Sequence, residues 1–443
     1  MAPGVAPRAA PVSTSGSTRD QDPPGAPPGA DPAQQRAPLL PIFLIVLVDV
    51  LGLSIVLPLL AVYAETFGAS AQVAALLIPV YAACQALAGP VLGALSDRVG
   101  RRRILLLSQA GTLIGFLCIA GAHALWMVFL GRVLDGLTAG NLGVAQAYIA
   151  DNTEPKNRAR SLALIGIAFG VGFLIGPAIT AALSGHGMST PLYVAAGLSF
   201  TSIICTATLL PPDDPARRAL SAANGAAANL AGMPGGKRLG LLSWNRYPAF
   251  FRRPVLGGVL TEFFLYQVAF YMFISGFALY AERRFTWHGH PFTPTEIGWL
   301  YAFSGLLGII IQGGMLGRLV RVFKERRLIT AGLLSLAAGY ALLGYVEPVA
   351  PLLFAMTLSA FGNGVLRPCL TSITTQIAGR EEQGVVLGLS QTLSSLASIL
   401  AGTLSGFLIE RSLLGTWGWS AALFCGVALI AGRWGSAKHV EAA

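Results

Sequence analysis

The stretch GALSDRVGRRRILLL (residues 93–107) concentrates charge in a chain that otherwise carries very little. Hydrophobic residues make up 54% of the 443 residues and charged residues only 11%, yet an acid and several arginines crowd between Asp97 and Arg103. Apolar runs of the roughly 18 residues that a membrane-spanning helix needs recur on both sides of it. Since backbone groups must be paired inside a bilayer, this pattern predicts an all-α integral membrane protein.

Twelve apolar segments are long enough to cross about 30 Å of hydrocarbon as helices. We expect these helices at residues 40–64, 73–95, 104–122, 125–150, 161–183, 190–210, 254–280, 295–317, 328–346, 350–376, 384–409 and 414–433. They fall into two sets of six, which predicts two six-helix bundles. The expected organisation is a disordered tail (1–38), a first bundle (39–210), a linker (211–253), a second bundle (254–433) and a tail (434–443).

Positive charge is distributed unevenly along the chain. Most of the 30 lysines and arginines fall in the tails, in the linker and in alternate loops. Because positive loops remain in the cytoplasm, both termini are expected there, in a multi-pass protein of the cell inner (plasma) membrane. The net charge of +10 on so apolar a chain is a topology signal, so nucleic acid is not an expected partner.

The opening stretch has a counterpart in the second half of the chain. GALSDRVGRRRIL (93–105) aligns with GRLVRVFKERRLI (317–329), and both contain Gly-x-Leu followed by a basic loop that ends in two arginines. Arg321 takes the place of Asp97. A repeat on this scale is typical of transporters, whose binding site lies near the membrane midplane between the halves.

The first copy of this loop predicts a tight connection between two helices. Gly93 would let a helix end approach another backbone closely, and Gly100 would permit a sharp turn. The arginines would anchor the loop at the membrane surface. Anchoring alone does not explain Asp97 or the two glycines.

The same loop resembles the signature of the major facilitator superfamily. Other stretches are similar to motifs of one branch, the tetracycline-efflux-type drug:proton antiporters with twelve helices. They are DVLGLSIVLP (49–58), YAACQALAGPVLG (81–93), GRVLDGLTAG (131–140), AYIAD (147–151), GVGFLIGP (170–177) and GNGVLRP (362–368). The resemblance covers residues 40–435, and it implies two six-helix bundles related by a pseudo-twofold axis that rock around a central cavity.

The resemblance also implies a gate. In the family, the loop acid, here Asp97, ties to the start of the helix expected at 384–409, and Arg101 and Asp151 complete a charge cluster. This cluster closes the cytoplasmic side in the outward-facing state. The implied gating residues are Gly93, Asp97, Arg98, Gly100, Arg101 and Asp151. The chain departs from the family pattern at Asp135, where many relatives carry a small residue.

Charges inside the predicted spans need a reason, because each costs about 2.5–3.5 kcal/mol on insertion scales. Asp49 lies midway along the first span, where a carboxylate removed from water is suited to load and release a proton. Arg132 and Asp135 share one helix face and would lie near Asp49. These three are the expected proton-coupling residues. The alternatives are a hydrogen bond between Asp49 and Gln85, and an internal Arg132–Asp135 ion pair.

Other polar residues of the spans are candidates for the wall of a substrate cavity. They are Gln85, Asn141, Gln146, Glu262, Tyr266, Gln267, Asn363, Arg367 and Gln391. Arg367 suits an anionic or zwitterionic substrate group, and the alternative is support of a helix break at Pro368. Glu262 has a second interpretation, in which its carboxylate reaches water near the membrane surface.

The helix expected at 161–183 is rich in small residues. Gly-x-x-x-Gly pairs allow the backbones of two helices to approach closely, and a proline can bend a helix. The expected packing residues are Gly166, Gly170, Gly172, Gly176 and Pro177. The family resemblance implies that this packing also blocks proton leak.

The sequence has no nucleotide-binding loop, no metal-ligand spacing and no nucleophile elbow. We therefore expect no cofactor, metal, nucleotide partner or enzyme activity. The expected function is secondary active transport, with a monomer in the lipid bilayer exporting a small amphipathic, tetracycline-like molecule in exchange for protons. The alternative is a facilitator or proton symporter of a small metabolite. A membrane enzyme would need a catalytic nucleophile, a metal site or an acid/base pair near an interface, and the sequence offers none. A sensor or scaffold would not explain the charges inside the spans.

Overall fold

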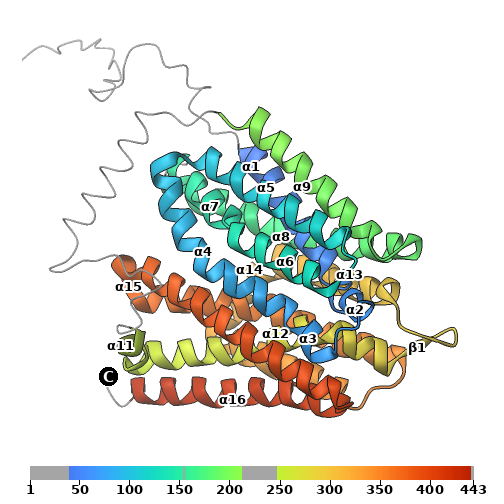
Figure 1. Cartoon of the computed structure of the whole chain (residues 1–443). Coiled ribbons are helices and arrows are strands. Elements are labelled where there is room, and N and C mark those ends of the chain that lie inside the picture. The colour runs from blue at the N-terminus through green and yellow to red at the C-terminus, as the bar shows by residue number, and fades with distance from the viewer. Residues whose placement is uncertain (1–38, 153–154, 212–246, 441–443) are drawn as a thin grey trace, which may run out of the picture. The chain divides into compact units, whose positions relative to one another are not determined.

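The computed structural model describes residues 39–152, 155–211 and 247–440 (Figure 1). Almost all of these residues are helical, which confirms the predicted all-α class. The tail expected at 1–38 and most of the linker expected at 211–253 lie outside the described residues. The last helix continues to Val440, past residue 433, where the sequence predicts its end.

The first half of the chain forms one set of packed helices. Their bounds are α1 Leu39–Val56, α2 Leu60–Glu65, α3 Ala71–Ala75, α4 Leu77–Val99, α5 Arg101–Ala120, α6 Leu125–Thr138, α7 Asn141–Asn152, α8 Pro155–Leu183, η1 Ser184–His186 and α9 Thr190–Leu209. Helix α1 packs against α8 and α9, while α5 packs against α6 and α9. This set surrounds the charged residues Asp49, Arg132 and Asp135.

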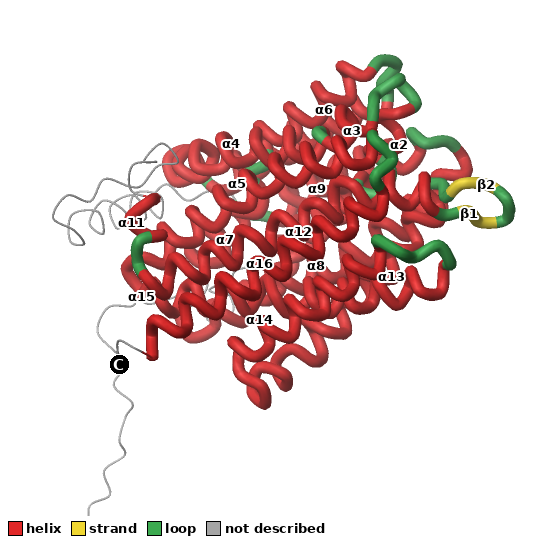
Figure 2. Tube along the Cα trace, turned by 90° about the horizontal axis from the view of Figure 1, so that it is seen from below, coloured by secondary structure: helices red, strands yellow, loops and turns green. Residues whose placement is uncertain are grey.

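The second half forms another set, with a small hairpin between its first two long helices (Figure 2). The bounds are α11 Tyr247–Phe251, α12 Pro254–Arg284, β1 Thr286–Trp287, β2 His290–Pro291, α13 Pro294–Ile309, the π-helix η3 Ile310–Met315, α14 Leu316–Leu343, α15 Val349–Glu410 and α16 Leu414–Val440. Helix α12 packs against α15 and α16, as does α14. Stacked aromatic rings, among them Phe273, Tyr340, Tyr280 and Trp417, fill the space between these helices.

Two predicted spans are interrupted. The segment expected at 40–64 divides into α1 and α2 at the turn that contains Pro58, since proline cannot donate the helical hydrogen bond. The segment expected at 125–150 divides into α6 and α7 at Ala139–Gly140, where Ala139 leaves the helical region with φ −72° and ψ 65°. In the described residues, nine helices are long and apolar enough to span a membrane, and these breaks account for part of the difference from twelve.

The segment expected as two helices at 350–376 and 384–409 is helical throughout as α15. Its two apolar parts, Val349–Ala378 and Val386–Glu410, run in opposite directions. In the first part Ser335 donates to the Leu358 carbonyl and Ser372 donates to Glu325, so this part passes along α14. In the second part Gln267 donates to Ser394 and Ser405 donates to the Met272 carbonyl, so it returns along α12.

The two sets of helices meet at one end of the molecule, which we call the Glu65 end because α2, α12 and α15 reach it with Glu65, Arg283 and Glu410. A methyl group added at Gly298 of α13 would lie 2.6 Å from the Pro177 carbonyl of α8, and one at Gly406 of α15 would lie 2.6 Å from the Gln72 backbone of α3. Such contacts need glycine, because any side chain would push the helices apart. We call the opposite end, which carries Asp97, the Asp97 end.

Candidate functional site

A small polar cavity of about 70 Å³ lies inside the first set of helices. Its polar wall contains two acids, Asp49 and Asp135, together with Tyr81, Gln85, Thr112 and Asn141. Apolar side chains complete it: Val46, Val50, Leu53, Phe116, Ala139, Leu142 and Phe169. The volume is smaller than the roughly 300–1,000 Å³ of sites for drug-sized molecules, so it suits water and protons better than a whole substrate.

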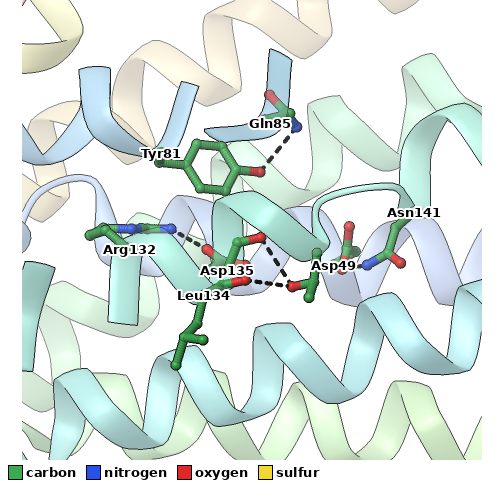
Figure 3. A network of polar contacts seen from close by, with 8 residues as sticks. Asp49, Tyr81, Gln85, Arg132, Leu134, Asp135 and Asn141 are labelled. Carbon is green, nitrogen blue, oxygen red and sulfur yellow. Dashed lines mark hydrogen bonds and ion pairs between the residues drawn. The ribbon is translucent and has the colours of Figure 1, made fainter. Parts of the chain in front are cut away.

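Asp49 is held by a neutral partner. The side-chain amide of Asn141 donates to its carboxylate at 2.6 Å (Figure 3). Asn141 reaches Asp49 because α7 begins at this residue, directly after the break at Gly140. Gly140 itself packs tightly, since a methyl group there would lie 2.9 Å from Leu92. The interruption of the predicted span therefore builds the site.

Asp135 is held by a charged partner. Arg132, on the preceding turn of α6, donates to its carboxylate, and both residues are almost completely buried. The Tyr81 ring covers the guanidinium at 4.7 Å, and Gln85 donates to the Tyr81 hydroxyl at 3.2 Å (Figure 3). The structure shows the internal Arg132–Asp135 ion pair that the sequence offered as an alternative, and Gln85 bonds to Tyr81.

The two acids therefore differ chemically. Neutralising Asp135 would leave the buried Arg132 charge without its counter-ion, which is strongly unfavourable. Neutralising Asp49 breaks no ion pair among the described residues, because the partner seen there is an amide. Of the two carboxylates, Asp49 is the one whose charge can change while the rest of the cavity stays intact.

The other candidates for the cavity wall are spread over both halves. Gln146 of α7, and Arg367 and Gln391 of α15, are exposed in the structure. Gln267 is buried on α12 and donates to Ser394 at 2.7 Å. Tyr266 is buried on α12, and its ring centroid lies 6.2 Å from that of Phe270. Asn363 has a buried amide oxygen without a hydrogen-bond partner among the described residues.

Glu262 is buried, whereas a residue that contacts substrate must be open to the cavity. Its carboxylate is buried and accepts from Arg326 of α14 at 2.6 Å. Gly432 of α16 covers this pair, since a methyl group there would collide with both side chains. The geometry is that of an ion pair between helices of the second set.

The loop between α4 and α5 turns sharply, as the sequence predicts. Gly100 has φ +117°, a conformation that residues with side chains rarely adopt. Asp97 pairs with Arg101 at 2.6 Å, and Ser96 also accepts from Arg101. Arg98 is exposed. Outside its own helix, no atom of the described residues lies within 4 Å of a methyl group added at Gly93, so the close approach expected there stays a prediction. The side chain of Asp151 lies outside the described residues.

Three of the four predicted packing glycines lie at close contacts. A methyl group at Gly172 would lie 2.6 Å from Val50, one at Gly176 would collide with Ser54, and one at Gly170 would lie 3.0 Å from Ile309. Pro177 lies inside α8, and its carbonyl faces Gly298 of α13. For Gly166 no atom of the described residues outside α8 lies within 4 Å of an added methyl group, so its packing role stays a prediction.

Sequence reasoning missed several residues of the site. Tyr81 lies four residues before Gln85 on the same helix face, so its position beside a predicted cavity residue was a usable signal. Thr112 and Phe116 had no such signal, because their contribution depends on how α5 packs. Arg326 was counted as loop charge, and its contact with Glu262 follows from the extent of α14.

Comparison with known proteins gives a consistent result. The family model described as Major Facilitator Superfamily matches residues 42–290 and 285–434. The tetracycline resistance protein, class C, of Escherichia coli is 30% identical over 405 residues, which cover 88% of this chain and 96% of the relative. Multidrug resistance protein 2 of Bacillus subtilis is 24% identical, with 84% of this chain covered and 90% of the relative.

Solved structures share the fold. The human organic anion transporter MFSD10 (TETRAN) superposes with a TM-score of 0.64 at 21% identity, covering 91% of this chain and 100% of that one. The peptide transporter POT in complex with sulfate has a TM-score of 0.68 at 17% identity, covering 90% of this chain and 95% of that one. At these identities the likeness concerns the fold alone.

Proposed function

This chain belongs to the Major Facilitator Superfamily, and on that premise we propose that it exports a small amphipathic, tetracycline-like molecule in exchange for protons by alternating access. It is a multi-pass membrane protein and a secondary transporter. The substrate class is carried over from the tetracycline resistance relatives. The expected membrane is the bacterial inner membrane, with the protein acting as a monomer.

The contrast between the two cavity acids carries the proposal. Asp49 is a carboxylate inside a span, with a neutral amide partner and a small polar cavity beside it. Asp135 is committed to Arg132. A proton carrier must change charge in every cycle, and Asp49 can do so without leaving a buried charge unpaired. We therefore assign Asp49 as the proton-coupling residue, with Arg132 and Asp135 as the fixed ion pair that shapes its surroundings.

The orientation of the cycle follows from the charge distribution. Basic loops favour the cytoplasm, so the Asp97 end is the cytoplasmic one. The contacts of Gly298 and Gly406 then lie at the outer end, and these contacts support an inward-facing assignment. In this state Asp97 pairs with Arg101 in its own loop.

The proposed substrate wall draws on both halves of the chain. Gln85, Asn141 and Tyr81 on one side, with Tyr266, Gln267, Asn363, Arg367 and Gln391 on the other, are the candidates. The exposed positions of Arg367 and Gln391 support contact with water or substrate between the halves. The buried Glu262–Arg326 pair favours a structural role for Glu262.

The test uses everted membrane vesicles with an acid-inside pH gradient and a fluorescent gradient probe. Tetracyclines, lipophilic cations, neutral drugs and sugars are added to vesicles with the wild type, Asp49→Asn and Glu382→Gln. We expect a tetracycline-like compound to collapse the gradient with the wild type and with Glu382→Gln, a carboxylate variant outside the cavity, and at least tenfold less with Asp49→Asn.

Two results would contradict the proposal. If Asp49→Asn exchanges protons for drug as fast as the wild type, Asp49 is not the carrier. If no compound moves protons while a metabolite still equilibrates across the membrane, the protein is a facilitator.

A further inference from the structure

A group of charged residues at the Glu65 end has no part in the cavity. Arg283, at the end of α12, donates to the Glu65 carboxylate of α2 at 2.6 Å. The same guanidinium donates to the Ile409 carbonyl of α15 at 3.4 Å. Both side chains are partly buried, with 33% of Arg283 and 22% of Glu65 exposed, so the pair is better shielded from water than a typical surface ion pair.

A second contact connects the same two sets of helices in the opposite sense. Glu410, at the end of α15, accepts from the backbone amide of Gln72 in α3 at 3.1 Å. In the first contact the acid belongs to the first half and the base to the second. In the second contact the acid belongs to the second half. Because the two contacts lie at different points of the seam, together they limit both the separation of the halves and any sliding of one half along the other.

The backbone beneath these contacts leaves little room. A methyl group at Gly406 would lie 2.6 Å from the Gln72 backbone, and one at Gly402 would lie 2.9 Å from the Ala75 carbonyl. Helices α3 and α15 therefore touch directly below Glu410. Because Glu65, Gln72, Arg283 and Glu410 border this seam, their contacts hold only while the Glu65 end is closed.

We propose that Glu65, Arg283 and Glu410 form a latch that holds the Glu65 end closed, and that they are positioning residues which set the balance between the two access states. At the opposite end, the family resemblance implies a similar role for the gate around Asp97. The inference rests on the alternating access of the proposed function, but it concerns different residues. Weakening the latch opens the Glu65 end more often without altering the cavity.

The same end offers a matched control. Arg284, next to Arg283, pairs with Glu347 at 3.4 Å, and both residues belong to the second half. Removing that pair changes the charge at the Glu65 end by the same amount, but it breaks no contact between the halves. A change that appears with Glu65→Gln and not with Glu347→Gln is therefore due to the latch.

The experiment measures the opening of the Glu65 end directly. Spin labels at Ala122 and Leu413, one on each half, report the distance between the halves for the full chain in lipid nanodiscs. We expect Glu65→Gln and Arg283→Gln to raise the population with the longer distance about threefold to tenfold. The exchanged pair, Glu65→Arg with Arg283→Glu, should restore most of the short distance, and Glu347→Gln should leave it unchanged.

Transport in vesicles supplies an independent readout. The latch variants should change KM and the maximal rate for substrate in different proportions, because they alter the population of states and not the cavity. Unchanged label distances in both single variants would overturn the latch, whether or not the exchanged pair folds. If the distances change as expected but no compound exchanges for protons, the latch stands and the proposed function fails.

Discussion

At the scale of single residues, the choice of partner separates side chains that the sequence treats alike. Asp49 and Asp135 are both acids inside spans, and sequence reasoning assigned both to proton coupling. The structure gives Asp49 an amide partner and Asp135 an arginine. Sequence spacing could place Arg132 and Asp135 on one face, because both lie on one helix. It could not find Asn141 for Asp49, because that contact joins α1 to α7.

The glycines of α8 show the same limit. All four were predicted from one repeating pattern, but only the helix that lies opposite decides which of them is in contact. Gly172 and Gly176 face α1, whereas no described residue outside α8 lies within 4 Å of a methyl group added at Gly166. A pattern along one helix therefore predicts a packing face and cannot tell where along that face the neighbouring helix passes.

We expect Gly172→Ala and Gly176→Ala to lower the free energy of unfolding by about 1–3 kcal/mol, since each added methyl group overlaps α1. The measurement is the thermal unfolding midpoint of the purified protein in detergent. Gly166→Ala is the control on the same helix, and it should be neutral or stabilising by up to about 1 kcal/mol, because alanine favours a helix. Equal effects at positions 166 and 176 would mean that α8 and α1 do not touch as described.

At the scale of elements, the two copies of the basic loop turn in the same way with different residues. Gly100 has φ +117° and ψ 147°, and in the alignment of 93–105 with 317–329 its counterpart is Lys324, with φ +61° and ψ 154°. The first turn uses glycine, which adopts this conformation readily. The second turn imposes it on a lysine, at a cost of about 1–3 kcal/mol. The repeat predicted from the sequence thus extends to the backbone angles.

Replacing Lys324 with glycine should relieve this strain. We expect Lys324→Gly to stabilise the protein by about 1 kcal/mol, after subtraction of the flexibility that glycine adds to the unfolded chain. Arg327→Gly, three residues later in the helical part of α14, should destabilise by about 1 kcal/mol. Thermal midpoints of the two variants that move in the same direction would contradict the strained turn.

The reversal within α15 is fastened to the start of α12. Arg253 donates twice to Glu382, at 2.5 and 2.9 Å, and this guanidinium lowers the pKa of the Glu382 carboxyl below its ordinary 4.5. The pair could not be predicted from the sequence, because the two residues lie on elements whose contact depends on the whole second half.

A lowered pKa makes this contribution dependent on pH in a known direction. The ion pair stabilises the protein above the pKa of an unfolded glutamate, and the contribution disappears as the pH falls through the lower pKa of the folded state. Because half of the Arg253 side chain is exposed, we expect Glu382→Gln to cost less than about 1 kcal/mol at pH 7. Unfolding midpoints of the variant and the wild type should converge below pH 4. If the difference in unfolding midpoint persists in acid, the effect of Glu382→Gln comes from packing and not from the ion pair.

At the scale of the whole molecule, composition and hydropathy were enough to predict the all-α membrane class. These properties are sums over many residues, so single errors cancel. The family was predicted from short motifs such as residues 93–103. The breaks at Pro58 and Ala139–Gly140, and the ends of α15 and α16, depend on local competition between helix and turn. The contacts between the halves form in only one of the two access states. Because the same sequence folds into both states, it cannot show which contacts are present in which state.

The glycine contacts at the Glu65 end have a consequence for how this protein can change. At Gly298 and Gly406 the two halves approach so closely that an added methyl group would lie 2.6 Å from backbone atoms of Pro177 and Gln72. Contacts this close accept no added side-chain bulk without pushing the helices apart. Substitutions that change the substrate can therefore accumulate in the cavity walls, while the glycines of the seam must be retained. A small rigid molecule bound in that seam would block transport of any substrate, because the halves could not close around it. A larger side chain at either glycine would not relieve the block, since the side chain itself would hold the halves apart.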